Sequence, residues 1–269
     1  MQKLINKEFS PVFDLVTKVG QELVKWHDRP DLKKLHSKKN FKTEADRQAH
    51  EILHKGLSAA FPGVPIVSEE DLIHVNQRPN EYWLVDPIDG TASWYDGFDG
   101  YVSQAALMID RQPQFGVIHC PRRSLTWSAE RGCGGYLNGR SLPALQPRES
   151  IKFIDNTRAP HGITRWCMSK LNTTDYLECG SLGLKSALVA DGSVDVFIKD
   201  VVVRDWDIAP VHVLLDELGG CLSLRNGDDY VYSGSYEKQN GFIVARDKQL
   251  LRDVIVSQEH YPGVDFVKL

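Results

Sequence analysis

Three features are missing from this 269-residue sequence: a cysteine framework, a long apolar run and a large excess of one charge sign. The five cysteines are an odd number, and no two of them have the CxxC spacing. This pattern excludes a disulfide framework or a cysteine zinc motif, and it predicts reduced thiols in a cytoplasmic protein. No apolar run approaches the length of about eighteen residues that a transmembrane helix needs.

The N-terminus also lacks the unbroken apolar core and the small-residue cleavage site of a signal peptide, so we expect no secretion signal. The net charge of −4 gives no electrostatic reason to expect binding to a nucleic acid polymer, and we expect no membrane partner either. Apolar residues make up 42% of the chain and charged residues 25%, which are ordinary globular values. The length suits one large domain or two small ones.

The spacing of apolar residues predicts helices that alternate with short strands. The helices are expected over 10–27, 43–60, 183–190 and 208–218, and the main strands over 64–67, 82–85, 102–109, 115–119, 194–198, 201–203 and 241–245. This order is typical of an α/β protein whose sheets are covered by helices. A connector over 141–150 suggests an N-terminal α+β part, 1–140, and a C-terminal α/β part, 141–269.

The most informative motif is WLVDPIDGT, in which an apolar strand ends on two aspartates. Asp86 and Asp89 lie three residues apart, Pro87 stiffens the turn between them, and Gly90 permits a positive φ. Carboxylates this close repel each other, and a bound divalent cation removes that repulsion. Ligand sets made only of oxygen favour Mg²⁺ or Mn²⁺ over zinc. The alternative interpretation is a solvated Asp-Pro turn that only caps a helix.

Three further acidic residues are ambiguous when each is taken alone. Glu69 begins an acidic run after the first predicted strand, and taken alone this run favours a solvated loop. Asp207 precedes an apolar helix and could be a plain N-cap, while Asp46 with Thr43 fits a capping box. In addition, the amides after Gly90 could begin a helix and form a phosphate-binding site.

The combination of SEE, WLVDPIDGT and WDIA followed by a helix ending in Gly-Gly resembles the inositol monophosphatase superfamily of lithium-sensitive, magnesium-dependent phosphatases. This superfamily includes inositol monophosphatases and 3′(2′),5′-bisphosphate nucleotidases. The resemblance runs from the lysine-rich loop before Thr43 to Gly220, which is most of the chain. It implies a layered αβαβα sandwich, a homodimer and a phosphoric monoester hydrolase inhibited by lithium.

The same resemblance implies a role for each acidic motif and two or three Mg²⁺ ions per site. The first metal would be bound by Glu69, Asp86 and the Ile88 carbonyl, and the second by Asp86, Asp89 and Asp207. Asp46 would help to hold the water shell of a third metal. The amides of Gly90, Thr91 and Ala92 would hold phosphate oxygens.

These roles predict hydrolysis by a metal-activated water, without a covalent intermediate. Glu69 and Thr91 would orient the water and take its proton, and we count Asp46 with them as the catalytic group. The sequence departs from the family pattern at Ala92-Ser93-Trp94 and at Pro210, which we expect in the first turn of its helix. These changes leave the carboxylates intact and make the substrate less certain than the chemistry.

Three residues are candidates for substrate binding: Ser181, Lys185 and Asp200. Lys185 is either a ligand of a second phosphate or an ordinary exposed helix lysine, and Asp200 either contacts sugar hydroxyls or ends a strand. We expect inositol monophosphate or a similar polyol phosphate as substrate, with 3′-phosphoadenosine 5′-phosphate as the alternative. A non-catalytic metal-binding regulatory protein is the alternative from another class. By resemblance, Lys38 or Lys39 could reach the site from a mobile loop.

Overall fold

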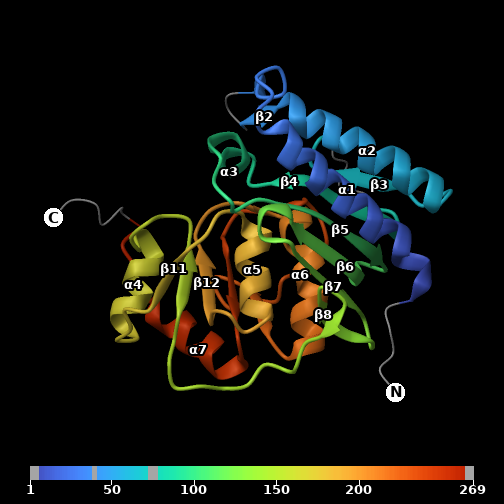
Figure 1. Cartoon of the computed structure of the whole chain (residues 1–269). Helices are drawn as coiled ribbons and strands as arrows, with labels where there is room; N and C mark the ends of the chain where they lie inside the picture. Colours follow the sequence, from blue (N-terminus) through green and yellow to red (C-terminus); the bar gives the residue numbers. More distant parts are fainter. Residues whose placement is uncertain (1–5, 38–40, 72–77, 264–269) are drawn as a thin grey trace.

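The computed structural model describes residues 6–37, 41–71 and 78–263. This part of the chain forms alternating layers of helices and sheets, with two sheets separated by one pair of helices and covered by two more pairs (Figure 1). The predicted αβαβα sandwich is therefore confirmed. The metal-ligand candidates lie where the first sheet meets the middle helices.

The first helical layer contains α1 (Ser10–Trp26) and α2 (Glu44–Ala60), which pack side by side on the first sheet (Figure 1). The two predicted helices match these bounds closely. The capping box also forms, because Thr43 donates its backbone N–H and its hydroxyl to Asp46 Oδ2 over 2.7 and 2.6 Å. A short hairpin of β1 (Leu35–Ser37) and β2 (Lys42–Thr43) precedes α2.

The first sheet has seven strands in chain order, with β3 parallel to β4 and every later pair antiparallel. Its strands are β3 (Ile66–Ser68), β4 (Glu81–Asp89), β5 (Val102–Ile109), β6 (Gln112–Cys120), β7 (Leu125–Glu130), β8 (Gly134–Leu137) and β9 (Arg140–Ser141). Strand β4 is longer than predicted because pairing with β5 continues to Asp89, after a register shift that follows Asp86. A short helix, α3 (Thr91–Asp96), follows it.

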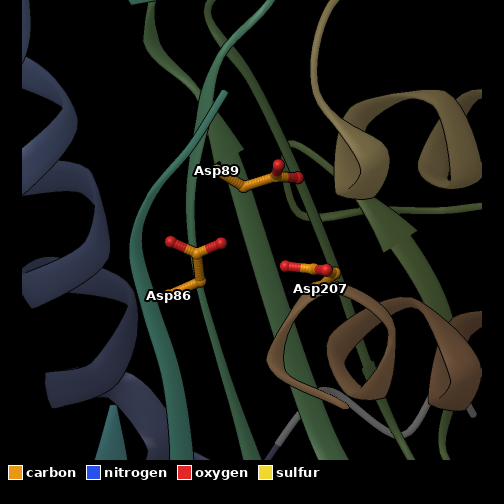
Figure 2. A group of neighbouring side chains, drawn as sticks. All are labelled: Asp86, Asp89 and Asp207. Carbon is orange, nitrogen blue, oxygen red and sulfur yellow. The ribbon is translucent and has the colours of Figure 1, made fainter. Parts of the chain in front are cut away.

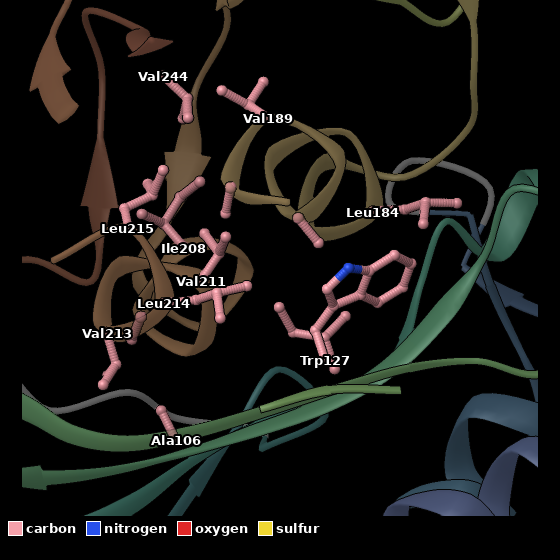
Figure 3. Close-up of a cluster of buried hydrophobic side chains, with 14 of the residues drawn as sticks. Ala106, Trp127, Leu184, Val189, Ile208, Val211, Val213, Leu214, Leu215 and Val244 are labelled. Carbon is pink, nitrogen blue, oxygen red and sulfur yellow. The ribbon is translucent and has the colours of Figure 1, made fainter. Parts of the chain in front are cut away.

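The middle layer consists of α5 (Leu182–Ala190) and α6 (Asp205–Leu218), which pack on each other. Their apolar side chains meet the first sheet on one side and the second sheet on the other (Figure 3). Trp127 of β7, Val211 of α6 and Val244 of the second sheet belong to this core, and all three are fully buried. The apolar composition of both helices follows from burial on two faces.

The second sheet has five strands, and a third pair of helices covers its outer face (Figure 1). In sheet order the strands are β11 (Tyr176–Glu178), β10 (Phe153–Asp155), β12 (Val196–Lys199), β16 (Phe242–Ala245) and β14 (Cys221–Leu224). The covering helices are α4 (Gly162–Lys170) and α7 (Lys248–Ser257), and a separate ribbon pairs β13 (Val203–Arg204) with β15 (Glu237–Lys238).

The connector predicted over 141–150 links the two sheets, since the first ends at Ser141 and the second begins at Phe153. Helix α6 packs on both sheets although it belongs to the C-terminal half. The division into two parts at 140/141 therefore stays a prediction. All five cysteines are free thiols, as predicted. Among the described residues, no helix is long and apolar enough to cross a membrane.

The start of α6 differs from the prediction. The helix begins at Asp205, three residues before the predicted start, so Asp207 is its third residue and Pro210 lies inside it rather than in the first turn. Proline has no N–H to donate to the carbonyl four residues earlier, which belongs to Trp206. The Gln104 side chain compensates by donating Nε2–H to that carbonyl over 3.1 Å. A polar strand residue, far away in sequence, makes the proline tolerable here.

Helix α6 approaches the sheet most closely at Gly116 of β6, where an added Cβ would overlap the Pro210 carbonyl. We expect Gly116→Ala to lower the free energy of unfolding by about 3 kcal/mol, because a backbone atom cannot move aside as a side chain can. Urea denaturation measures this. Ala129→Gly, at the register partner of Gly116 on β7, removes a methyl group without a collision and is the control. An equal or smaller loss in Gly116→Ala would contradict the close contact.

Candidate metal centre

Three buried aspartates point toward one another at the junction of the first sheet and α6 (Figure 2). Asp86 and Asp89 come from the end of β4, and Asp207 comes from the first turn of α6. One carboxylate oxygen from each lies within 4.8 Å of the others. The side chains are almost excluded from water, with exposed fractions of 1%, 7% and 5%. The fold therefore brings together Asp86 and Asp207, which are 121 positions apart in the sequence.

Among the three aspartates, Asp86 has the surroundings that most clearly favour a bound cation. Its Oδ1 accepts the Ile88 N–H over 3.0 Å, but its buried Oδ2 has no hydrogen-bond partner among the described residues. Burial, together with the charges of Glu69 and Asp89, raises the pKa of Asp86 well above its usual range. An unpaired buried carboxylate oxygen is costly, and a divalent cation both satisfies it and favours the ionised form. The residues present therefore fit a hard metal ion.

Asp89 connects β4 to the first turn of α5. It accepts the N–H groups of Leu182 over 3.3 Å and Gly183 over 2.5 Å. Burial raises its pKa, and the Gly183 N–H and the Lys185 charge oppose that rise. A side chain at Gly183 would overlap Gln104 and stand 3.0 Å from Asp89 Oδ2, so only glycine permits this approach. The helix start thus fixes the orientation of the carboxylate.

Asp207 is fixed by its own helix. The Arg204 N–H donates to Asp207 Oδ2 over 2.9 Å, which is the N3 half of a capping arrangement. Burial and the charges of Asp89 and Glu69 raise its pKa well above the usual range. The plain N-cap interpretation accounts for the hydrogen bond, but not for the position of the carboxylate beside two others.

A buried ionic network anchors the first turn of α6 just beside Asp207. Asp205 is fully buried, forms an ion pair with Arg78 and accepts the Tyr230 hydroxyl over 2.9 Å. The guanidinium of Arg78 also lies 3.9 Å from the centre of the Tyr236 ring. The sequence offered only isolated charges here, because nothing in it shows that residues 78 and 205 are partners.

Glu69, Asp46 and Thr91 form an edge beside the three aspartates. Burial raises the pKa of Glu69 to about 7, while the charge of Lys42 lowers it, and burial raises the pKa of Asp46 to about 6. Thr91 Oγ1 lies 2.8 Å from Asp46 Oδ1 and 3.2 Å from the Ile88 carbonyl oxygen, so its single proton can bond to either. Thr91 and Asp46 are therefore in contact, and Glu69 is near enough for the charge of Asp46 to contribute to the rise of its pKa.

The turn after β4 requires glycine. Gly90 has φ 93°, and an added Cβ would lie 3.0 Å from the Ser181 side chain and 3.2 Å from the Gly100 carbonyl. Helix α3 begins directly after it, which leaves the N–H groups of Thr91 and Ala92 without partners inside the helix. That these amides hold phosphate oxygens stays a prediction.

A cleft of about 560 Å³ opens from this turn. Its lining includes Asp89, Gly90 and Ala92 at one side and Ser181, Lys185 and Lys199 of the C-terminal half. The interpretation of Lys185 as an exposed helix lysine is wrong. Its side chain is buried, its Nζ donates to the Gly180 carbonyl, and burial lowers its pKa to about 8. Helix α5 is enclosed between two sheets, so it has no exposed face at this position.

One predicted substrate contact, Asp200, is absent from the residues that line the cleft. Asp200 is exposed, and the cleft is lined by its neighbours Lys199 and Val201. Lys199 was not predicted, although it pairs with buried Asp155 over 2.6 Å and donates to Asn156 Oδ1 over 3.0 Å. Its place directly before the candidate residue Asp200 was the only indication in the sequence that Lys199 could line the cleft.

Among the lysines, Lys38 and Lys39 lie outside the described residues. The lysine seen at the acidic edge is Lys42, whose Nζ donates to the Glu69 carbonyl over 2.6 Å and lies 3.0 Å from Glu70 Oε1.

This fold and this buried acidic centre define a metal-dependent phosphatase. The profile of the inositol monophosphatase family matches residues 3–261. The chain belongs to that family, whose members are phosphomonoesterases.

Three proteins illustrate the range of its relatives. The 3′(2′),5′-bisphosphate nucleotidase CysQ of Aggregatibacter actinomycetemcomitans is 31% identical over 86% of this chain and 88% of its own length. The Nus factor SuhB of Salmonella typhimurium is 27% identical over 88% of this chain and 92% of its own. The solved structure of an IMPase from Thermotoga maritima has a TM-score of 0.76 and 25% identity, covering 94% of this chain and 98% of that one.

Because the acidic side chains repel one another, removing one charge should stabilise the metal-free protein. We expect Asp86→Asn to raise the melting temperature in EDTA by about 3 °C. The folded-state pKa of Asp86 lies above its unfolded value, so the contribution of Asp86 to wild-type stability falls as pH rises above about 4, and the difference between the two proteins is largest at alkaline pH. Calorimetry at pH 8 measures it.

In the same experiment Mn²⁺ should raise the melting temperature of the wild type and not of Asp86→Asn. Asp191→Asn is the control, because the Trp127 Nε1–H and the Ser193 N–H already pair with both Asp191 carboxylate oxygens. It should lose stability in EDTA and keep the gain with Mn²⁺. A melting temperature of Asp86→Asn below that of the wild type in EDTA would contradict the conclusion that the Asp86 charge destabilises the metal-free protein.

Proposed function

We propose that this protein is a Mg²⁺-dependent phosphomonoesterase whose substrate is a small phosphate ester with a second anionic group. The main support is that the aspartate group and the cleft share Asp89. The same cleft is lined by two lysines. Retention of every predicted carboxylate argues against the non-catalytic alternative.

Mg²⁺ would be held by Glu69, Asp86, Asp89, Asp207 and the Ile88 carbonyl, all of which offer oxygen. Mn²⁺ has the same ligand preference. When bound, such ions lower the pKa of a bound water, neutralise phosphoryl oxygens and stabilise the leaving alkoxide.

The chain itself would position the reactants and move the proton. With its hydroxyl directed at Asp46 Oδ1 and not at the Ile88 carbonyl, Thr91 would take a proton from the attacking water and pass its own proton to Asp46. Glu69 would share that role. The N–H groups of Gly90, Thr91 and Ala92 would meet the charge that grows on the phosphoryl oxygens. None of these residues needs to form a covalent intermediate.

The second anionic group would bind at the lysine side of the cleft. Lys185 and Lys199 both line it, together with the acids Asp89, Asp96 and Glu178, and Lys199 pairs with buried Asp155. Ser181 caps α5 and lines the cleft at this position, where its hydroxyl would lie beside the ligand. The 31% identity to a bisphosphate nucleotidase agrees with this reading, and 3′-phosphoadenosine 5′-phosphate is the representative substrate.

Inositol monophosphate or a similar polyol phosphate is the second candidate, and the resemblance to the Thermotoga maritima IMPase favours it. In that case exposed Asp200 would have to turn toward the sugar hydroxyls. The SuhB relative is named a Nus factor, so a partner of that kind is a further candidate for this chain. Lithium inhibition, a homodimer, a cytoplasmic location and the absence of a nucleic acid partner stay predictions.

Asp89 tests the metal role because it belongs to both the acidic group and the cleft. We expect Asp89→Asn to lower turnover with Mg²⁺ by about 100-fold or more, since one charge is lost where the transition state is stabilised. The fold should persist, because the asparagine carbonyl can still accept the Gly183 N–H. Phosphate release from 3′-phosphoadenosine 5′-phosphate and from inositol 1-phosphate measures turnover. Asp96→Asn, an exposed residue of the same cleft, is the control, and near-wild-type turnover in Asp89→Asn would sink the assignment.

Lys199 tests the substrate class. The wild type should have a higher kcat/KM for 3′-phosphoadenosine 5′-phosphate than for inositol 1-phosphate. Lys199→Met should reduce that ratio roughly tenfold, because only the first substrate has a second phosphate to lose a charge partner. Lys55→Met, an exposed lysine of α2, is the control and should leave the ratio unchanged. A wild-type preference for inositol 1-phosphate would support the second candidate instead.

A further inference from the structure

Lys42 places a fixed positive charge at the acidic edge of the metal centre. It lies in β2, directly before the residue that caps α2. Its Nζ donates to the Glu69 carbonyl over 2.6 Å and pairs with Glu70 Oε1 over 3.0 Å. The side chains of Lys42 and Glu70 are 21% and 12% exposed, so this is a half-buried pair that water screens only weakly.

The same edge is where the sequence resemblance implied a third metal, with Asp46 holding its water shell. Asp46 is already occupied by protein donors. Its Oδ2 accepts the N–H and the hydroxyl of Thr43, and its Oδ1 accepts the hydroxyl of Thr91. This carboxylate caps a helix and orients a catalytic hydroxyl, so little of its acceptor capacity remains.

The opposite side of the centre is different. Asp86 Oδ2 is buried without a partner, and three carboxylates lie within 4.8 Å of one another. The need for added positive charge is therefore concentrated at Asp86, Asp89 and Asp207. At the edge of Glu69 and Glu70 the chain supplies the charge itself.

We propose that the Lys42 ammonium takes the place of a third metal ion, so that the centre holds two divalent cations and not three. This inference rests on the proposed function, since it assumes that the aspartate group binds metal. A third divalent ion would have to displace the ammonium from two acceptors or sit beside it against like-charge repulsion. Lys42 is a positioning residue in this scheme, because it acts on the site through Glu69 and Glu70.

The test is the stoichiometry of Mn²⁺ binding, measured by isothermal titration calorimetry on the full chain without substrate. Wild type, Lys42→Arg and the exposed-lysine control Lys34→Met should each bind two ions. Lys42→Met should bind a third, because Glu70 and the Glu69 carbonyl lose their cation. Lys42→Met combined with Glu70→Gln should bind two again, since the freed charge is gone.

Each measured number of bound Mn²⁺ ions either supports or overturns the proposal. Three ions in the wild type, or two in Lys42→Met, would overturn the proposal while leaving the proposed function intact. Absence of Mn²⁺ binding in the wild type would overturn the proposed function and this inference with it. The wild-type stoichiometry keeps the test valid even if Lys42→Met does not fold, and melting temperatures in EDTA report whether it does.

Discussion

Electrostatic repulsion among buried carboxylates is the constraint on which this structure depends. Asp86, Asp89 and Asp207 are kept close together in a place that water hardly reaches, and each has a raised pKa as a result. Such an arrangement persists only if the surroundings hold every member in position. Much of the local architecture has that effect: the amides of α5 on Asp89, the Arg204 N–H on Asp207, and the ion pair that anchors α6.

The division of labour between the two halves of the chain follows from this arrangement. In the proposed function, strand β4 and the turn after it would supply the reacting groups, whereas α5 and β12 supply lysines that line the cleft. The two sets meet through Asp89, which touches both. A substrate change therefore needs few alterations near β4, as family members named for different substrates illustrate.

The sequence was sufficient for features that are encoded locally. The spacing of Asp86 and Asp89, the capping box of Thr43 and Asp46, and the amphipathic helices all depend on neighbours in the chain. It was insufficient where burial or pairing depends on distant segments. Lys185 is buried because two sheets enclose α5, and Pro210 is tolerated because Gln104 donates to the Trp206 carbonyl. Lys42, Lys199 and Arg78 each form an ion pair with an acidic residue that their positive charge in the sequence does not identify.

The separation of the acidic residues along the chain also has a consequence for how the molecule forms. Asp86 and Asp207 meet only after a loop of more than a hundred residues has closed, and the Arg78–Asp205 pair spans 127 positions. No local fragment of the chain therefore contains the whole acidic centre. The free energy of metal binding at this centre would therefore stabilise only chains whose two halves have already docked.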